Sequence, residues 1–370
     1  MLVYIVLLLV AIILLLANKY SKENALFLML MMLIVCGLRD YNIGIDTLSY
    51  VDNYKYYSNE NTSEFLFNYT YSLIHFIGGS GHLWLFFVSV LLFMPYIVAI
   101  KQFSIAPVIS AFIFLASPML FFFDSMNGIR QWTSGGLILL SFLYRNEREI
   151  IKCVICFVLA MGFHLSSIVA LPFMFIWEKC FSYKIVVCSL IGITICSIVM
   201  AHFNLSSFFE GYSVLLDSMQ IDADTRFAKY AKYGEMENTT NWKYYVVNIL
   251  PMNLICLASY PSKVRNKGDN RCFNKNVDCS SQNGFLFNAL FMGTILMNIC
   301  SISIKYGHRI FFAVVALQLI LLPRQYVLGN RNQKKWILAL IVYMSVWFLY
   351  YINSINGQRI GSTVPYSFFF

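Results

Sequence analysis

The chain has 370 residues, of which 59% are apolar and only 12% carry a charge. An ordinary globular protein carries about 25% charged residues, so this composition excludes a soluble enzyme. The aromatic content of 17% excludes a disordered chain. The net charge of +9 does not indicate nucleic-acid binding, because the basic residues lie in short loops between apolar runs and not along one face. The composition predicts an all-α, polytopic integral membrane protein.

Apolar runs long enough to cross a membrane follow one another along the chain. A helix spans a bilayer core with ~20 apolar residues, or fewer where neighbouring helices or local thinning help. A further run, Ile151–Trp177, is longer than one crossing needs and a little short for two, and Gly162–Ser167 interrupts it. We therefore expect a helical bundle of about 11–12 transmembrane helices, one of them broken or re-entrant. The other predicted spans are Leu2–Leu16, Ala25–Leu38, Leu83–Ile100, Ala106–Phe123, Ile129–Tyr144, Ile185–Phe203, Tyr244–Tyr260, Phe285–Ile304, Ile310–Leu322 and Trp336–Ile352.

The distribution of Lys and Arg decides how the interrupted run is placed. If this run crosses twice or turns back, six loops share one side of the membrane and hold 17 of the 27 basic residues. If it crosses once, every later loop changes side, and the basic residues are divided almost evenly between the two sides of the membrane. The positive-inside rule favours the first arrangement. The predicted cytoplasmic loops are then 18–24, 101–105, 145–152, 178–184, 261–284 and 323–335.

Two longer segments, 39–82 and 204–243, then lie on the outer side. Within the first, Phe65–Phe76 predicts an interfacial or re-entrant helix. Loops on a rigid scaffold often carry binding and catalytic residues, so we expect function in these segments. The basic inner loop 261–284 is explained by membrane topology alone. The whole chain, 1–370, is predicted to form a single transmembrane domain.

Two clusters of polar residues lie where predicted spans end on the outer side, and such residues are functional candidates by default. The first is Arg39–Tyr50, which includes Asp46; a helix cap beside an interfacial aromatic belt would also explain it. The second is Phe123–Gln131, in which Asp124 sits in a tight turn. Its Arg130 begins a helix, where a cation opposes the helix dipole. Either an anionic ligand or pairing with Asp124 would explain this arginine.

Three further clusters complete the outer set. His164 and Ser166 lie in the interrupted run, where polar backbone at membrane depth needs protein or water to satisfy it. A packed, hydrogen-bonding histidine is the alternative to a proton acceptor there. Arg226 and Tyr230 stand four residues apart on a predicted amphipathic helix, which surface solvation would also explain. The run Lys305–Arg309 places several cationic groups together, and snorkelling explains one of them but not the set.

Five of the ten basic residues outside the predicted cytoplasmic loops come from distant parts of the chain and share the predicted outer side, where the positive-inside rule expects few. Arginine forks suit phosphate oxygens, and a diphosphate needs several donors at once. A lipid diphosphate is the natural anion for a site at the outer membrane boundary. The five residues are Arg39, Arg130, Arg226, Lys305 and Arg309.

The order of these motifs resembles a known family. It is similar to the EpsG-like branch of the Wzy family of bacterial O-antigen, capsule and exopolysaccharide polymerases, over nearly the whole chain. The chain differs where small residues often follow the second motif, since it has Trp132 and Thr133 there. The motifs are R-x4-G-x-D-x3-Y (Arg39, Gly44, Asp46, Tyr50), FD-x4-IRQ (Phe123, Asp124, Ile129, Arg130, Gln131), FH-x-S (Phe163, His164, Ser166) and PY-x-FF (Pro365, Tyr366, Phe368, Phe369).

The resemblance implies a GT-C-like, metal-independent glycosyltransferase without a cofactor. It would act in the bacterial inner membrane, with its active site facing the periplasm. Its substrates would be a glycan donor and an acceptor repeat unit, both linked to undecaprenyl diphosphate. Its partners would be the lipid bilayer and, as a further candidate, a chain-length regulator protein, with no nucleic acid.

Physical chemistry suggests roles for the candidate residues. The enzyme must stabilise charge on a leaving diphosphate and remove a proton from the attacking hydroxyl. We predict no metal ligands. The predicted diphosphate-binding residues are Arg130 and Arg309, with Arg39 and Arg226 as further contacts. The predicted general base is His164, with Asp46 in reserve. The predicted positioning residues are Gln131, Ser166, Asp124, Tyr230 and Tyr50.

Two other functions fit the same residues. A transporter of lipid-linked sugars would also line its cavity with arginines, although such proteins often show internal repeats and none is detectable here. An O-antigen ligase would share the outward site and differ only in its acceptor.

Overall fold

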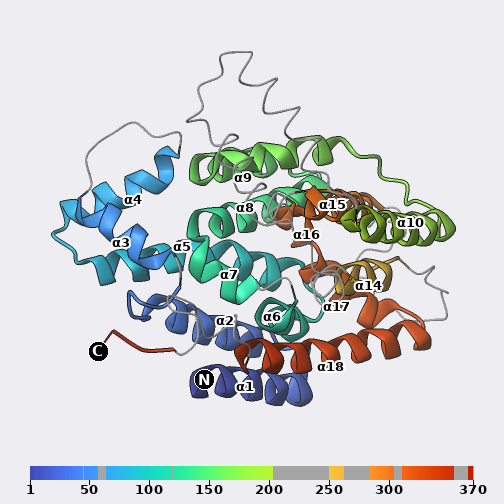
Figure 1. Ribbon diagram of the computed structural model, residues 1–370, viewed down its shortest axis with the longest axis horizontal. Helices are drawn as coiled ribbons and strands as arrows, with labels where there is room; N and C mark the ends of the chain where they lie inside the picture. Colours follow the sequence, from blue (N-terminus) through green and yellow to red (C-terminus); the bar gives the residue numbers. More distant parts are fainter. Residues whose placement is uncertain are drawn as a thin grey trace, which may run out of the picture.

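The computed structural model of the chain describes residues 1–44, 46–56, 64–118, 121–202, 250–261, 284–303, 311–353 and 366–369. Throughout this part of the chain the regular structure is helical, apart from an isolated antiparallel bridge between Arg39 and Phe368. Most of the long helices run along one common direction (Figure 1). The all-α prediction is confirmed.

The bounds of the helices follow the apolar runs. In chain order the elements are α1 (Leu2–Asn18), α2 (Lys22–Gly37), α3 (Thr47–Lys55), α4 (Phe65–Phe76), α5 (Gly81–Phe103), α6 (Pro107–Ala116), α7 (Phe121–Asn127), α8 (Ile129–Asn146), α9 (Ile150–Phe163), the 3-10 helix η1 (Leu165–Phe175), α10 (Tyr183–His202), α14 (Leu250–Ala258), α15 (Gly284–Ser303), α16 (Phe312–Val315), α17 (Gln318–Leu328) and α18 (Arg331–Asn353).

Two predicted spans are divided. The run Ala106–Phe123 forms α6 and α7, which are bent by 57° relative to each other. The cause of this break lies in Ser117, which precedes Pro118 and adopts an extended conformation. Proline disfavours helical geometry in the residue before it, so α6 ends there. The run Ile310–Leu322 is likewise divided between α16 and α17.

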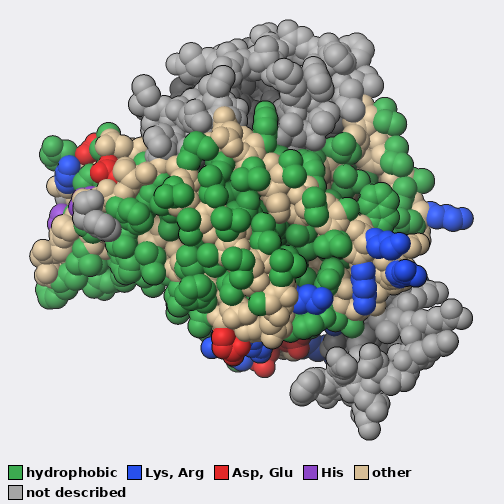
Figure 2. Space-filling model, turned by 90° about the horizontal axis from the view of Figure 1, so that it is seen from below, with side chains coloured by type: hydrophobic (Ala, Val, Ile, Leu, Met, Phe, Trp, Pro, Cys, Tyr) green, Lys and Arg blue, Asp and Glu red, His purple; other side chains and the backbone are tan. Residues whose placement is uncertain are grey.

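The surface of the bundle is that of a membrane protein. Within the described residues, two helices, α5 and α18, are long and apolar enough to cross a membrane, and the bent pair of α6 and α7 makes a third if it is one span. Shorter apolar helices such as α1 expose large side chains at helical spacing, among them Leu9, Ile13 and Leu16. Figure 2 shows that hydrophobic side chains cover most of one long face. Apolar area of this extent needs a lipid or protein partner. The expected number of 11–12 crossings and the GT-C-like fold stay predictions.

The interrupted run turns back on itself, as predicted. A short connection joins α8 to α9, and η1 then returns along α8. Near the start of α8, the hydroxyl of Ser134 contacts that of Ser167. Near its end, Arg145 Nε donates to the carbonyl of Met174 over 2.8 Å. His164 forms the turn between α9 and η1.

The loops predicted to be cytoplasmic gather at one end of the bundle. Hydrogen bonds connect residues that lie in or directly beside these loops. The pairs are Lys19 with Tyr326, Gln102 with Tyr144, Arg145 with Glu178, Phe181 with Tyr260, and Tyr260 with Gln333. Most of the Lys and Arg side chains visible in Figure 2 lie toward its right side. Both chain termini, α3 and α4 lie at the left of Figure 1. The described parts of these loops therefore lie together. Residues 262–283 lie outside the described part of the chain, and the side of the membrane that the loops face stays a prediction.

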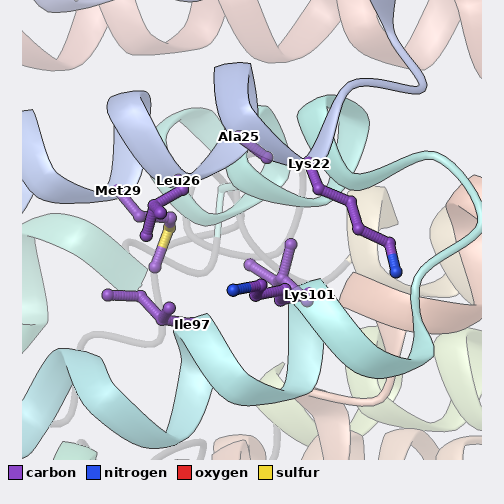
Figure 3. Close-up of a pocket in the computed structure, with 7 residues that line it drawn as sticks. Lys22, Ala25, Leu26, Met29, Ile97 and Lys101 are labelled. Atoms are coloured by element: carbon purple, nitrogen blue, oxygen red, sulfur yellow. The ribbon is translucent and has the colours of Figure 1, made fainter.

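A small pocket lies between α2 and α5, and apolar side chains form most of its lining. Figure 3 shows Lys22 and Lys101 beside Leu26, Met29 and Ile97. Both lysines belong to loops of the predicted cytoplasmic end. None of the predicted site residues lines this pocket.

Candidate functional site

The candidate site is built around the turn at His164. Helix α9 ends at Phe163, and His164 adopts an extended conformation with φ −155° and ψ 113°. Its backbone N–H still donates to the carbonyl of Ala160, and its own carbonyl accepts from Ser167 over 3.1 Å. The backbone at this break is therefore satisfied within the chain, as membrane depth requires. The imidazole remains 19% exposed.

Glu64 joins this histidine to Arg130. The Nδ1 atom of His164 lies 2.7 Å from Glu64 Oε1, and Arg130 Nη1 donates to Glu64 Oε2. The Glu64 side chain is only 2% exposed. An ionised carboxylate can only accept hydrogen bonds, so when Glu64 is ionised, Nδ1 donates to it and the lone pair of a neutral ring is on Nε2. This is the arrangement of a carboxylate-oriented general base.

Arg130 retains a surface that a ligand can reach. It is the second residue of α8, and its side chain is 36% exposed. Its guanidinium carbon lies 5.5 Å from the ring centroids of both Tyr50 and Phe67. Burial raises the pKa of Tyr50, so its hydroxyl stays protonated near neutral pH. The arginine is therefore held by one carboxylate and two rings, while its side chain as a whole stays partly exposed.

Close packing between α4 and α9 brings Glu64 to His164. Glu64 immediately precedes α4, and Leu66 of that helix packs on Gly162 of α9. A Cβ atom at position 162 would lie 2.6 Å from Leu66 Cδ1. Glycine at this position allows the approach. Glu64 was not among the predicted site residues, although a lone carboxylate at the start of an apolar outer helix is a signal that the sequence does contain.

Arg39 is completely buried. Nη2 donates to the carbonyl of Met126 over 2.9 Å, and Nη1 donates to the carbonyl of Cys36. The same guanidinium lies 3.4 Å from the hydroxyl of Thr47. This arginine therefore joins the ends of α2 and α7 to the start of α3, and its predicted role as an anion contact stays a prediction.

The remaining described candidates lie at the same end of the bundle. Asp46 caps α3, where its carbonyl accepts from the N–H of Tyr50 over 3.0 Å. Asp124 is partly buried in α7, and Gln131 follows Arg130 in α8. Ser166 is exposed at the start of η1, whereas the next residue, Ser167, is buried against α8. The positioning roles of these residues stay predictions.

Several predicted site residues lie outside the described part of the chain. These are Arg226 and Tyr230 of the outer segment 204–243, and Arg309 with its neighbour Lys305. The inner loop 262–283 also lies outside it. Their predicted places and roles remain untested.

The last motif of the chain meets the first. The N–H of Asp40 donates to the carbonyl of Ser367 over 3.0 Å, and Tyr366 Oη donates to the carbonyl of Val35 over 2.6 Å. The Arg39–Phe368 bridge lies between these bonds. The first and the last motif, which lie more than 300 residues apart in the sequence, are therefore neighbours in the structure.

The described site has donors, a proton acceptor and a carboxylate, but it does not collect metal ligands. Among the residues that the structure describes, no three or more His, Cys, Asp or Glu side chains come together to hold a metal ion. The expectation of a metal-free reaction stays a prediction, since segment 204–243 is not described.

Comparison with known proteins gives one match. The model of the EpsG family matches residues 24–368, nearly the whole chain. No curated protein and no solved structure matches. The match includes α2 to α18 and the C-terminal segment that pairs with Arg39, as the resemblance predicted. With its helical bundle and its apolar surface, the chain belongs to the EpsG family of exopolysaccharide-related membrane proteins.

Proposed function

We propose that the chain is a polysaccharide polymerase that transfers a growing glycan from a polyprenyl diphosphate onto a lipid-linked repeat unit. The reaction would take place at the periplasmic face of the bacterial inner membrane. The observation that carries the proposal is the joint placement of His164, Glu64 and Arg130 at one end of an apolar bundle. Membership of the EpsG family supports a polymerase.

The geometry suggests how the transfer would proceed. The acceptor hydroxyl gives its proton to Nε2 of His164, and its oxygen forms a bond to the anomeric carbon of the donor glycan. The bond from that carbon to the diphosphate oxygen breaks, and the electron pair leaves with the diphosphate. The exposed part of the Arg130 fork stabilises the charge that develops there. A single displacement of this kind inverts the configuration at the anomeric carbon.

The other candidates keep secondary roles in this proposal. Arg309 would be the second diphosphate-binding arginine and Arg226 a further anion contact. Asp46 is the reserve base. The groups that position the sugars would be Gln131, Ser166, Asp124, Tyr230 and Tyr50.

Replacement of the base tests the proposal. In cells whose polymer depends on this chain, His164→Ala should leave single repeat units on the final product, seen as the loss of the long-chain ladder on a gel. The matched control is His75→Ala, which removes an exposed histidine of α4 that contacts the carbonyl of Tyr54 and stacks on the ring of the same tyrosine. This control should retain the ladder. Both variants must be present in the membrane at wild-type level.

The same gel separates the rival functions. Loss of a flippase would trap lipid-linked repeat units inside the cell, and loss of a ligase would accumulate finished polymer on its carrier. Either pattern in the His164→Ala cells, or a normal ladder, would contradict a polymerase that uses this histidine.

A further inference from the structure

We propose that Glu64 is a positioning residue that orients His164 and Arg130 together, so that the base and the diphosphate-binding arginine form one unit. This inference rests on the proposed function. It is motivated by a single carboxylate whose two oxygens bind two different groups, with Oε1 on the imidazole and Oε2 on the guanidinium.

The burial of Glu64 makes a purely structural role a poor explanation. Its side chain is 2% exposed, so its charge is removed from water. Buried ion pairs generally add little net stability compared with apolar side chains of similar size, because desolvation offsets the attraction. A carboxylate at this place is therefore better explained by what it does to its two partners. Its position at the start of α4, where the helix dipole favours an anion, lowers the cost of keeping it ionised.

The packing of α4 fixes the carboxylate in place. Trp84 of α5 stacks on Tyr71 with ring centroids 4.8 Å apart, and its Nε1 donates to Thr70 Oγ1 over 2.9 Å. Leu66 of the same helix contacts Gly162 of α9. Because α4 packs on both α5 and α9, a shift of the backbone at Glu64 away from His164 would disturb this packing. A supporting group that is itself held rigidly is what precise orientation of a base requires.

The two contacts predict two separable effects. Through Oε1, Glu64 keeps hydrogen on Nδ1 and the lone pair on Nε2, which affects the rate of proton removal and therefore kcat. Through Oε2, it keeps the Arg130 fork in place before substrate arrives, which affects the KM for the diphosphate-linked donor. A residue that only supported the fold would change the amount of protein without changing either constant.

The test is the Glu64→Gln variant of the full chain in lipid nanodiscs, with a polyprenyl-diphosphate-linked repeat unit as donor and acceptor. The amide keeps the shape of the side chain but loses the charge. We expect kcat to fall roughly 10²-fold, within the usual range for general base catalysis, and KM to rise several-fold. Glu178→Gln is the matched control, since Glu178 pairs with Arg145 at 3.5 Å at the opposite end of the bundle. It should leave both constants unchanged.

A mutant cycle separates positioning from general damage. If Glu64 acts on catalysis only by orienting His164 and Arg130, adding Glu64→Gln to a protein that already carries His164→Ala and Arg130→Lys should cause no further fall in the residual kcat. Two independent effects would multiply, and that result would overturn the inference. The Glu64→Asp variant provides a second test in case the Glu64→Gln protein does not fold. It keeps the charge but is one methylene too short to reach both partners, so kcat or KM should still change.

Failure of this inference is distinguishable from failure of the proposed function. Wild-type kcat and KM in Glu64→Gln, with an inactive His164→Ala, would refute the positioning role and leave the polymerase intact. Wild-type constants in both variants would refute the use of His164 and with it the proposed reaction.

Discussion

At the scale of single residues, two arginines with similar sequence surroundings have different places in the structure. Arg39 and Arg130 both lie where an apolar run meets the outer end. Arg39 is buried among backbone carbonyls, whereas Arg130 is 36% exposed and pairs with Glu64. The sequence alone does not show which of the two arginines is buried. The acceptors of Arg39 include main-chain oxygens, and the partner of Arg130 is 66 residues away. Of these two arginines, Arg130 is the one whose side chain keeps exposed surface.

This difference predicts the effect of Arg130→Lys. Lysine keeps the positive charge beside Glu64 but cannot hold the carboxylate and a phosphate oxygen with one planar fork. We expect the variant to fold and to polymerise on the order of 10²-fold more slowly, as when a well-placed charge-stabilising donor is removed. The rate of elongation of a lipid-linked repeat unit measures this.

A matched substitution at the other end of α8 serves as the control. Arg145 lies 3.9 Å from the ring centroid of Phe285 and also pairs with a carboxylate, Glu178. Arg145→Lys should elongate glycan at the wild-type rate. Equal rates in the two lysine variants would show that Arg130 supplies charge alone or is structural.

At the scale of helices, the site depends on how closely α4 approaches α9. The sequence predicts the bounds of α4 and the interruption at His164, because both follow from apolar runs and the residues that end them. It does not predict the contact between the two helices, because a glycine that permits close approach looks the same as one that permits a turn. In the structure Gly162 performs the first role, since it lies within α9 and packs against Leu66.

Gly162→Leu should therefore separate Glu64 from His164. A Cβ atom at this position already meets Leu66 at 2.6 Å, and a full leucine side chain cannot be accommodated without moving α4. Overpacking of this kind typically costs about 1–3 kcal/mol. We expect the protein to remain in the membrane, with a lowered melting temperature and short glycan chains.

Gly192→Leu provides the comparison for this substitution. Gly192 also lies in an apolar helix, α10, but no atom lies within 4 Å of a Cβ atom built there. This variant should retain both its melting temperature and its glycan length. If the two leucine variants behave alike, the approach of α4 to α9 has no importance for the site.

At the scale of the whole molecule, the sequence predicts composition-driven features well and long-range pairing poorly. The positions of the apolar helices and the shared end of the basic loops follow from the length and charge of each run. The hairpin at His164 follows from the count of Lys and Arg. By contrast, the link between Glu64 and His164 joins residues 100 positions apart, and the link between Arg39 and Phe368 depends on where the C-terminal segment returns. Neither has a local signal.

The orientation of the bundle in the membrane gives the last prediction. Because η1 returns along α8, residues after the hairpin lie at the same end as those before it. A phosphatase reporter that is active only outside the cytoplasm should therefore be inactive when fused after Asn146, Lys179 or Asn330, and active when fused after Gly78. A fluorescent reporter that folds only in the cytoplasm should give the reverse pattern at the same four positions. The fusion after Lys179 is decisive, since phosphatase activity there would mean that Ile151–Trp177 crosses once. The basic loops would then be divided between the two sides, and His164 would lie within the membrane instead of at its outer boundary.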